Sequence, residues 1–241
     1  MNVVTIYVRI YLDCLRRAAA SIAKSPWTLL LPMGLLLALQ LAGVLASPLG
    51  VGAGLVMGLV LAALGSCYLY FLAELVGNAR VRVNEFGRSV RVYFWAVANV
   101  LFVYWIASLL LGAMLRGSAQ AQAFNFALTL VALVLLNAVP EVIYQSNTHG
   151  GLETMGRAVR FLQSNWLEWG VPNALFLAGL WFLLSRAQAS LFFLFGYLGL
   201  VALSILVGAL FHLVMVFRGH LFAALDGTSH RQRMFRYRTT A

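Results

Sequence analysis

The sequence predicts an all-α integral membrane protein, a bundle of six transmembrane helices with short amphipathic interfacial helices. Of its 241 residues, 62% are hydrophobic and 10% are charged, whereas about a quarter of a soluble domain is charged. Apolar runs long enough to cross roughly 30 Å of hydrocarbon follow one another along the chain. Lysine and arginine collect in alternate loops, as in multi-pass membrane proteins. One membrane domain accounts for these three observations.

Residues 1–26 are predicted to form an amphipathic helix in the headgroup plane. Apolar residues recur there at helical spacing, namely Val4, Val8, Leu12, Leu15 and Ile22. Charged residues take the opposite face, namely Arg9, Asp13, Arg16 and Lys24. Such a helix buries its apolar side among acyl chains while its arginines reach the surface. Pro26 ends the helix, because a residue before proline avoids the helical region.

The predicted transmembrane domain covers residues 27–217, and a basic cytoplasmic tail follows at 218–241. Five runs are long enough to span, at Trp27–Ser47, Val51–Ala79, Val92–Leu115, Gln122–Tyr144 and Ser190–Phe217. A sixth run, Val171–Ser185, is shorter, and it spans only if its helix extends back toward Trp166 or the bilayer thins there.

The distribution of basic residues sets the predicted orientation. An even number of spans places both termini on one side. Fifteen lysines and arginines lie in the N-terminal segment, the second and fourth loops and the tail, against Arg116 and Arg186 in the other loops. Positive loops stay in the cytoplasm, so both termini are predicted to be cytoplasmic. The same residues favour anionic lipid headgroups as partners, and no nucleic-acid partner is expected.

Three segments predict an internal repeat. Asp13 leads through arginines to Trp27, Glu85 leads to Trp95, and Glu153 leads to Trp166. Each tryptophan opens an apolar run, so each unit would be an interfacial helix followed by a transmembrane hairpin. The alternative is that loops between spans share arginine and tryptophan only because membrane interfaces favour both residues.

Small residues follow every fourth position along the second span, at Gly50, Gly54, Gly58, Ala62 and Ser66. Such a ridge lets a neighbouring helix approach closely. The same row continues to Glu74, which is therefore expected to point into protein, because a carboxylate facing hydrocarbon costs at least a few kcal/mol.

A polar cluster is the candidate site. Its residues are predicted to gather just inside the cytoplasmic face, and they are Glu74, Glu141, His212, Asn78, Asn137 and Asn173. Pro140 and Pro172 predict broken helix ends nearby, and transporters build sites from such ends. The cluster would bind a cation, a proton or a lipid headgroup. The alternative is that these side chains lie at headgroup depth and pair with nearby arginines, as Glu74 would with Arg80.

No catalytic, cofactor or metal signature accompanies this cluster. The sequence has no phosphate-binding glycine-rich loop with lysine, no His-Glu-x-x-His and no Gly-x-Ser-x-Gly. Cys14 and Cys67 are far apart, which supports neither a disulfide framework nor a metal site. An enzyme is therefore not favoured, and neither a cofactor nor a metal is expected.

Three features carry a resemblance: the arginine-rich interfacial helix, the Ser-Pro-Trp entry to the first span at residues 25–27, and the run Asn137–Glu141. With these, the chain resembles uncharacterised bacterial polytopic membrane proteins that are similar to the membrane domain fused to some glycerophosphodiester phosphodiesterases. The resemblance implies a bacterial inner membrane. The hydrolase domain of those enzymes has no counterpart here, so no catalytic residue carries over.

Two functions are compatible with this architecture. The first is a non-catalytic scaffold or accessory subunit that organises lipids or partner proteins, as a homo-oligomer or with other chains. The second is a permease-like membrane subunit of a transporter driven by a separate ATPase. Co-purification distinguishes them, because only the second requires an associated ATPase.

Overall fold

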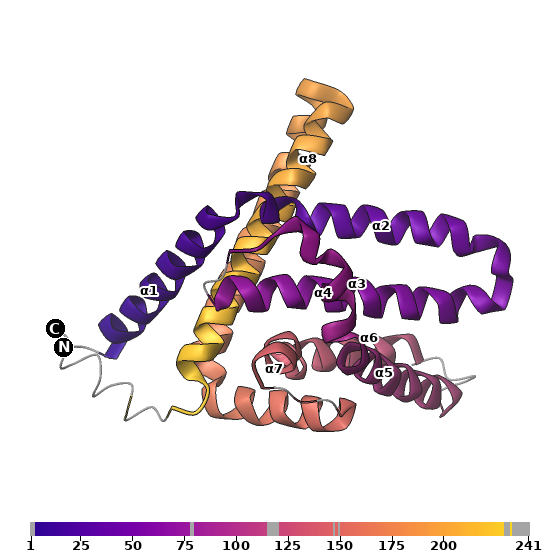
Figure 1. The fold of residues 1–241 in the computed structure, drawn as a ribbon, viewed down its shortest axis with the longest axis horizontal. Coiled ribbons are helices and arrows are strands. Elements are labelled where there is room, and N and C mark those ends of the chain that lie inside the picture. Colours follow the sequence, from indigo (N-terminus) through magenta and orange to yellow (C-terminus); the bar gives the residue numbers. More distant parts are fainter. Residues whose placement is uncertain are drawn as a thin grey trace. The chain divides into compact units, whose positions relative to one another are not determined.

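The computed structural model of this chain describes residues 3–77, 80–114, 121–146, 148, 150–228 and 232. Within these ranges the chain is helical and contains no strand (Figure 1). The α-helices are α1 (Val3–Lys24), α2 (Leu31–Ala46), α3 (Ala53–Val76), α4 (Phe86–Val92), α5 (Phe94–Met114), α6 (Ala121–Leu135), α7 (Val139–Ser146) and α8 (Gly151–Leu225). Short 3-10 helices cover Pro26–Leu30, Ser47–Gly52 and Val83–Glu85.

Six helical stretches of the described chain are long and apolar enough to cross a membrane, which confirms the predicted fold class. They are Pro26–Gly50, Ala53–Val76, Phe94–Met114, Gln122–Ser146, Gly151–Arg186 and Phe195–Leu225. The short run at Val171–Ser185 is part of the fifth stretch, whose helix extends back past Trp166. The run is therefore long enough to span, as the sequence required of it. The protein is thus an all-α, multi-pass membrane protein.

The chain divides into two compact units, each described here by itself. The first unit comprises residues 1–38, 71–83 and 165–241. The second comprises residues 39–70 and 84–164. The first therefore holds α1 and most of α8, and the second holds α4, α5, α6 and α7.

The element order repeats three times, as the sequence predicts. A helix is followed by a residue with non-helical backbone angles, then by two long apolar helices. These three hinge residues are Ser25 (φ −146°, ψ 67°), Tyr93 (φ −113°, ψ 7°) and Asn165 (φ −133°, ψ 29°). A tryptophan stands one or two positions after each of them, at Trp27, Trp95 and Trp166. The break thus lies where the chain leaves a surface helix and enters a span.

Two of the hairpins reverse at a glycine with positive φ. Gly50 (φ 54°) connects α2 to α3, and a Cβ placed on Gly43 would lie 3.8 Å from Met57 across this hairpin (Figure 1). Gly196 (φ 58°) divides α8 into antiparallel halves. Side chains other than glycine rarely adopt these angles. Gly50 is therefore a turn residue, and the expectation that it begins the helical ridge of the second span is wrong.

The two halves of α8 run antiparallel about Gly196, within the first unit. Phe176 and Phe217 meet edge to face with ring centroids 5.4 Å apart, and Trp169 and Phe222 do so at 6.2 Å. The two residues of each pair lie at nearly equal distances along the chain before and after Gly196. This is expected for two helices that fold back on one another at that residue.

The two prolines behave differently. At Pro140 the predicted break is present, since α6 ends at Leu135 and α7 begins at Val139. Pro172 instead lies inside α8. The helix breaks earlier, at Asn165, so the expectation of a broken helix end at Pro172 is wrong. A proline is tolerated in a membrane helix when another group satisfies the carbonyl that loses its donor.

The ridge of α3 is divided into an open part and a buried part. A Cβ placed on Gly54 or Gly58 would meet no atom within 4 Å. Ala62 and Ser66 are buried, and Ser66 hydrogen-bonds to the second hinge. The ridge therefore contacts protein in the part nearer the hinge, and its glycines face open space.

Candidate functional site

Helix α1 has two apolar faces, of which the sequence analysis identified one. The face that packs on protein carries Ile6, Ile10, Cys14 and Ala18, all buried. The predicted stripe is exposed, with Val8 and Leu12 each 47% accessible and Leu15 37%. Of the remaining stripe residues, Ile22 is buried and the side chain of Val4 lies outside the described residues. Helix α1 is thus packed against its own unit and exposes a second apolar side.

Two tyrosines of α1 hold it to α8. The Tyr7 hydroxyl donates to Glu168 Oε1 at 2.8 Å, and the Tyr11 hydroxyl donates to the backbone oxygen of Glu168 at 3.1 Å. Positions four apart share a helix face, so both hydroxyls reach one residue, and the two rings stack at 6.4 Å. Glu168 is 8% exposed. A buried carboxyl group requires such donors.

The second of these bonds compensates for a proline. In a helix, the backbone N–H of residue 172 would donate to the oxygen of residue 168. Pro172 has no N–H, so the Glu168 carbonyl loses its helical donor. The Tyr11 hydroxyl supplies a donor to that oxygen instead. At the next residue along the helix, Asn173 Nδ2 donates to the Trp169 oxygen at 2.7 Å. We call Tyr7, Tyr11, Glu168 and Pro172 the α1–α8 junction.

Further polar residues of the first unit lie in the second half of α8. The guanidinium of Arg218 lies 5.1 Å from the ring centroid of Trp169, within cation–π range. Both residues are buried. Ser21 Oγ and His220 Nε2 are 3.3 Å apart, joining the C-terminal part of α1 to α8. The contact surface between α1 and α8 therefore combines apolar packing with several hydrogen bonds.

Two groups of α1 keep their protons far above neutral pH. Burial, and then the nearby Glu168 carboxylate, raise the pKa of Tyr11 to about 12. Tyr11 therefore remains a hydrogen-bond donor throughout the physiological pH range. Burial is also the main cause that raises the pKa of Cys14 to about 11, against a lowering by Arg17. Since the thiolate is the reactive form, Cys14 is expected to be an inert structural cysteine.

The residues of the predicted polar cluster divide between the two units. Glu74, His212 and Asn173 belong to the first unit, whereas Asn137 and Glu141 belong to the second. Glu141 and His212 are fully buried, and Glu74, Asn137 and Asn173 are partly exposed. Asn78 lies outside the described residues. Of these six residues, Asn173 lies beside the α1–α8 junction, where its side chain donates to the Trp169 oxygen. That all six residues form one site remains a prediction.

The sequence analysis missed Glu168, Tyr7 and Tyr11. Two signals could have found them. Glu168 is an acid within a tryptophan-rich approach to an apolar run, four residues before a proline that leaves its carbonyl without a helical donor. Tyr7 and Tyr11 are two hydroxyls on one helix face. What the sequence does not supply is their pairing, which joins positions 161 and 157 residues apart.

The α1–α8 junction can hold a surface helix against a span, and its geometry suits that task better than bond-making chemistry. Among the described residues, no group of three His, Cys, Asp or Glu side chains is placed to hold a metal ion. No family model, curated protein or solved structure matches this chain.

Proposed function

We propose that the protein is a non-catalytic component of the bacterial cytoplasmic membrane that organises anionic lipids at the cytoplasmic surface. One observation carries this proposal. Helix α1 is hydrogen-bonded to a span, yet it exposes Val8, Leu12 and Leu15 beside the exposed Arg9 and Arg16. A helix of this kind lies in the interface, with its apolar side among acyl chains and its arginines among headgroups.

The proposed cytoplasmic orientation of α1 rests on the distribution of basic residues. An impermeant thiol reagent added to intact cells should label a cysteine introduced at Gln188 but not one introduced at Thr228. The native Cys14 and Cys67 are both buried, so their background should be low. Labelling at Thr228 in intact cells would reverse the orientation and remove α1 from the cytoplasmic leaflet.

Lipid preference tests the function itself. Wild-type protein in nanodiscs of equal parts phosphatidylglycerol and phosphatidylcholine should retain phosphatidylglycerol when ejected into a native mass spectrometer. The double change Arg9→Gln and Arg16→Gln should lower this preference, because each basic residue near an anionic surface contributes about 1 kcal/mol. Thr5→Gln, at another exposed position of α1, is the matched control. Equal lipid retention by all three proteins would contradict the proposal.

The rival function is a permease-like subunit driven by a separate ATPase. Affinity purification from gently solubilised membranes separates the two proposals. A stoichiometric ATPase in the eluate would favour the rival, and its absence together with retained anionic lipid supports the lipid-organising function.

A further inference from the structure

The hydroxyl and amide side chains of the first span are those of Thr28, Gln40 and Ser47. The two hydroxyls are bonded within their own segment. Thr28 Oγ1 donates to the Ser25 oxygen and Ser47 Oγ donates to the Val44 oxygen, each at 2.8 Å. A hydroxyl that bonds to its own backbone needs no further partner in a membrane. Gln40 differs from both residues.

The side chain of Gln40 is exposed on α2, and no hydrogen bond to it is present among the residues that the structure describes. Gln40 lies ten residues before the turn at Gly50, which is about 15 Å along a helix. It is therefore near the middle of the roughly 30 Å hydrocarbon core. An amide without a hydrogen-bond partner is costly there, because no water can take the place of the partner. Gln40 thus requires a polar group from outside its own helix.

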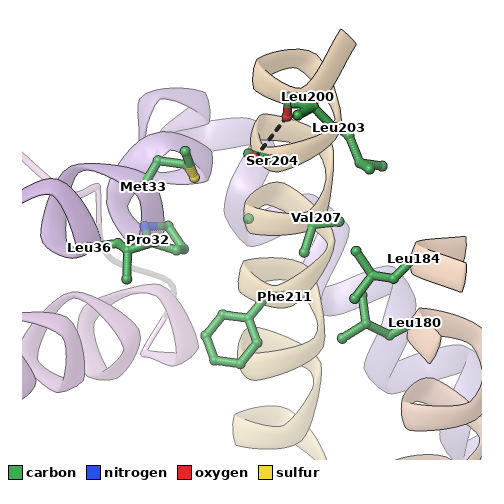
Figure 2. A pocket seen from close by; sticks show the side chains of 11 residues that line it. Pro32, Met33, Leu36, Leu180, Leu184, Leu200, Leu203, Ser204, Val207 and Phe211 are labelled. Atoms are coloured by element: carbon green, nitrogen blue, oxygen red, sulfur yellow. Dashed lines mark hydrogen bonds between the residues drawn. The ribbon is translucent and has the colours of Figure 1, made fainter. Parts of the chain in front are cut away.

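Helix α2 is packed at its start and exposed at its end. In the first unit, Pro32, Met33 and Leu36 line a pocket together with residues of α8 (Figure 2). After these residues, the part of α2 that carries Gln40 belongs to the second unit. In that part, Val44 is 70% exposed. Gln40 and Val44 are four positions apart, so they share one face of the helix, which we call the Gln40–Val44 face.

We propose that the Gln40–Val44 face binds the same face of a second copy of the chain, with the two Gln40 amides hydrogen-bonded to each other. An amide both donates and accepts, so two identical amides satisfy one another through two reciprocal bonds. Copies inserted in the same orientation carry Gln40 at the same depth, as a two-fold axis along the membrane normal requires. A single polar residue in an apolar helix pair also fixes its register. A different protein would need a matching group at this depth, which a second copy always supplies.

Disulfide formation in isolated membranes tests the position of the interface. Val44→Cys lies one turn from Gln40 and leaves the amide in place. Oxidation with copper phenanthroline should link two copies there, because a disulfide requires Cβ atoms within about 3.5–4.5 Å of each other. The native Cys14 and Cys67 are buried and should contribute little.

Leu45→Cys is the matched control, because Leu45 is also exposed, at 78%, but points about 100° further round the helix. It should give several-fold less linked dimer than Val44→Cys. Equal yields from the two variants would indicate random collision and would overturn the proposal. So would the absence of a linked dimer at Val44→Cys.

The role of the amide is tested by the dimer dissociation constant in a bilayer. Full-length protein with one fluorophore at Thr228→Cys is reconstituted at decreasing protein-to-lipid ratios, and photobleaching steps count the copies in each vesicle. Gln40→Leu should raise the dissociation constant about tenfold, which corresponds to about 1.4 kcal/mol for two interhelical hydrogen bonds. Gln40→Asn keeps an amide and should have a smaller effect, and Leu45→Ala should have none. An unchanged constant for Gln40→Leu would overturn the proposal.

This inference goes beyond the proposed lipid function of α1 and does not rest on it. The Arg9→Gln and Arg16→Gln variant should leave the dimer dissociation constant unchanged, and Gln40→Leu should leave the cytoplasmic lipid preference unchanged. Failure of one proposal is therefore distinguishable from failure of the other.

Discussion

Both halves of α3 consist almost entirely of apolar residues, but they differ in what surrounds them. In the half that follows the Gly50 turn, Leu55 is 74% exposed and Leu59 50%. In the half that begins at Ala62, the side chains of Ser66, Cys67 and Phe71 are all buried. Apolarity cannot account for this difference, because lipid tails are as apolar as leucine and no hydrophobic force drives helices together within a bilayer.

Polar contacts explain which half is buried. Ser66 Oγ donates to the Ser89 oxygen at 2.9 Å and accepts from the Tyr93 backbone N–H at the same distance. Ser89 Oγ contacts Cys67 Sγ at 3.1 Å. At the first hinge, Ser25 Oγ likewise accepts from the Val81 N–H at 3.2 Å. At the second hinge a helix thus supplies the partner of a hinge backbone N–H, whereas at the first hinge the hinge residue itself supplies the partner of a loop N–H. Protein packing is therefore concentrated at the hinge ends of the spans, while the opposite ends are exposed for lipids or other helices.

The largest loss of stability is expected from a substitution at Gly151, which makes the closest contact in the buried region. Gly151 begins α8, and a Cβ there would lie 2.6 Å from the backbone oxygen of Asn99. Gly151→Ala should therefore push α8 away from α5 and destabilise the protein by about 1–3 kcal/mol or more. The measurement is thermal unfolding of the purified protein in mild detergent.

Gly156→Ala is the matched control for that change, because it lies on the same helix and its Cβ would meet nothing within 4 Å. It should raise stability slightly, since alanine favours a helix over glycine by up to about 1 kcal/mol. Equal melting temperatures for the two variants would show that the hinge end is not the tightly packed region.

The next effect concerns the hydrogen bonds of the second hinge. Ser66→Ala removes the acceptor of the Tyr93 N–H together with the donor to the Ser89 oxygen. A buried group left without its partner costs about 1–3 kcal/mol, so the melting temperature should fall. Ser108→Ala is the control, because the Ser108 hydroxyl is exposed and bonds only within its own helix, to the Tyr104 oxygen. A loss as large for Ser108→Ala would mean that hinge hydrogen bonds have no special role.

The sequence predicted the spans, the tryptophans that open them and the threefold order of elements because each depends on local composition and helix length. It could not predict which side of an apolar helix is buried. In α1 the face with Ile6 and Ile10 is as apolar as the stripe with Val8 and Leu12, and only packing within the first unit, which buries the first face, separates them. The ridge of α3 has the same ambiguity, since small residues permit a close approach without requiring it.

A smaller effect is expected at the α1–α8 junction. The double change Tyr7→Phe and Tyr11→Phe keeps both rings and removes the two hydroxyl donors to Glu168. Each hydrogen bond contributes about 0.5–1.5 kcal/mol net, so α1 should separate from the bundle more often. Trypsin should then cleave after the exposed Arg16 and Arg17 several times faster.

Tyr104→Phe, a change on the partly exposed surface of α5, serves as the control for that experiment. It should leave the cleavage rate of α1 unchanged. If the double variant is cleaved at the wild-type rate, the other contacts of α1 hold it in place, and the Tyr7 and Tyr11 hydroxyl donors do not control its attachment.

The smallest change in stability is expected from glycine-to-alanine substitutions in α3, which compare the exposed half of this helix with its buried half. Gly58 lies in the exposed half, where a Cβ would meet nothing within 4 Å, and Gly65 lies in the buried half, where a Cβ would lie 3.2 Å from Val97 Cγ1. Gly58→Ala should therefore gain up to about 1 kcal/mol from helix propensity. Gly65→Ala should gain less or lose stability, because Val97 must move to admit the methyl group. Gly54→Ala should behave as Gly58→Ala does. If both exposed-half variants instead lower the melting temperature, another helix lies on the glycine ridge as the sequence pattern predicts, and the exposed half of α3 is an interface.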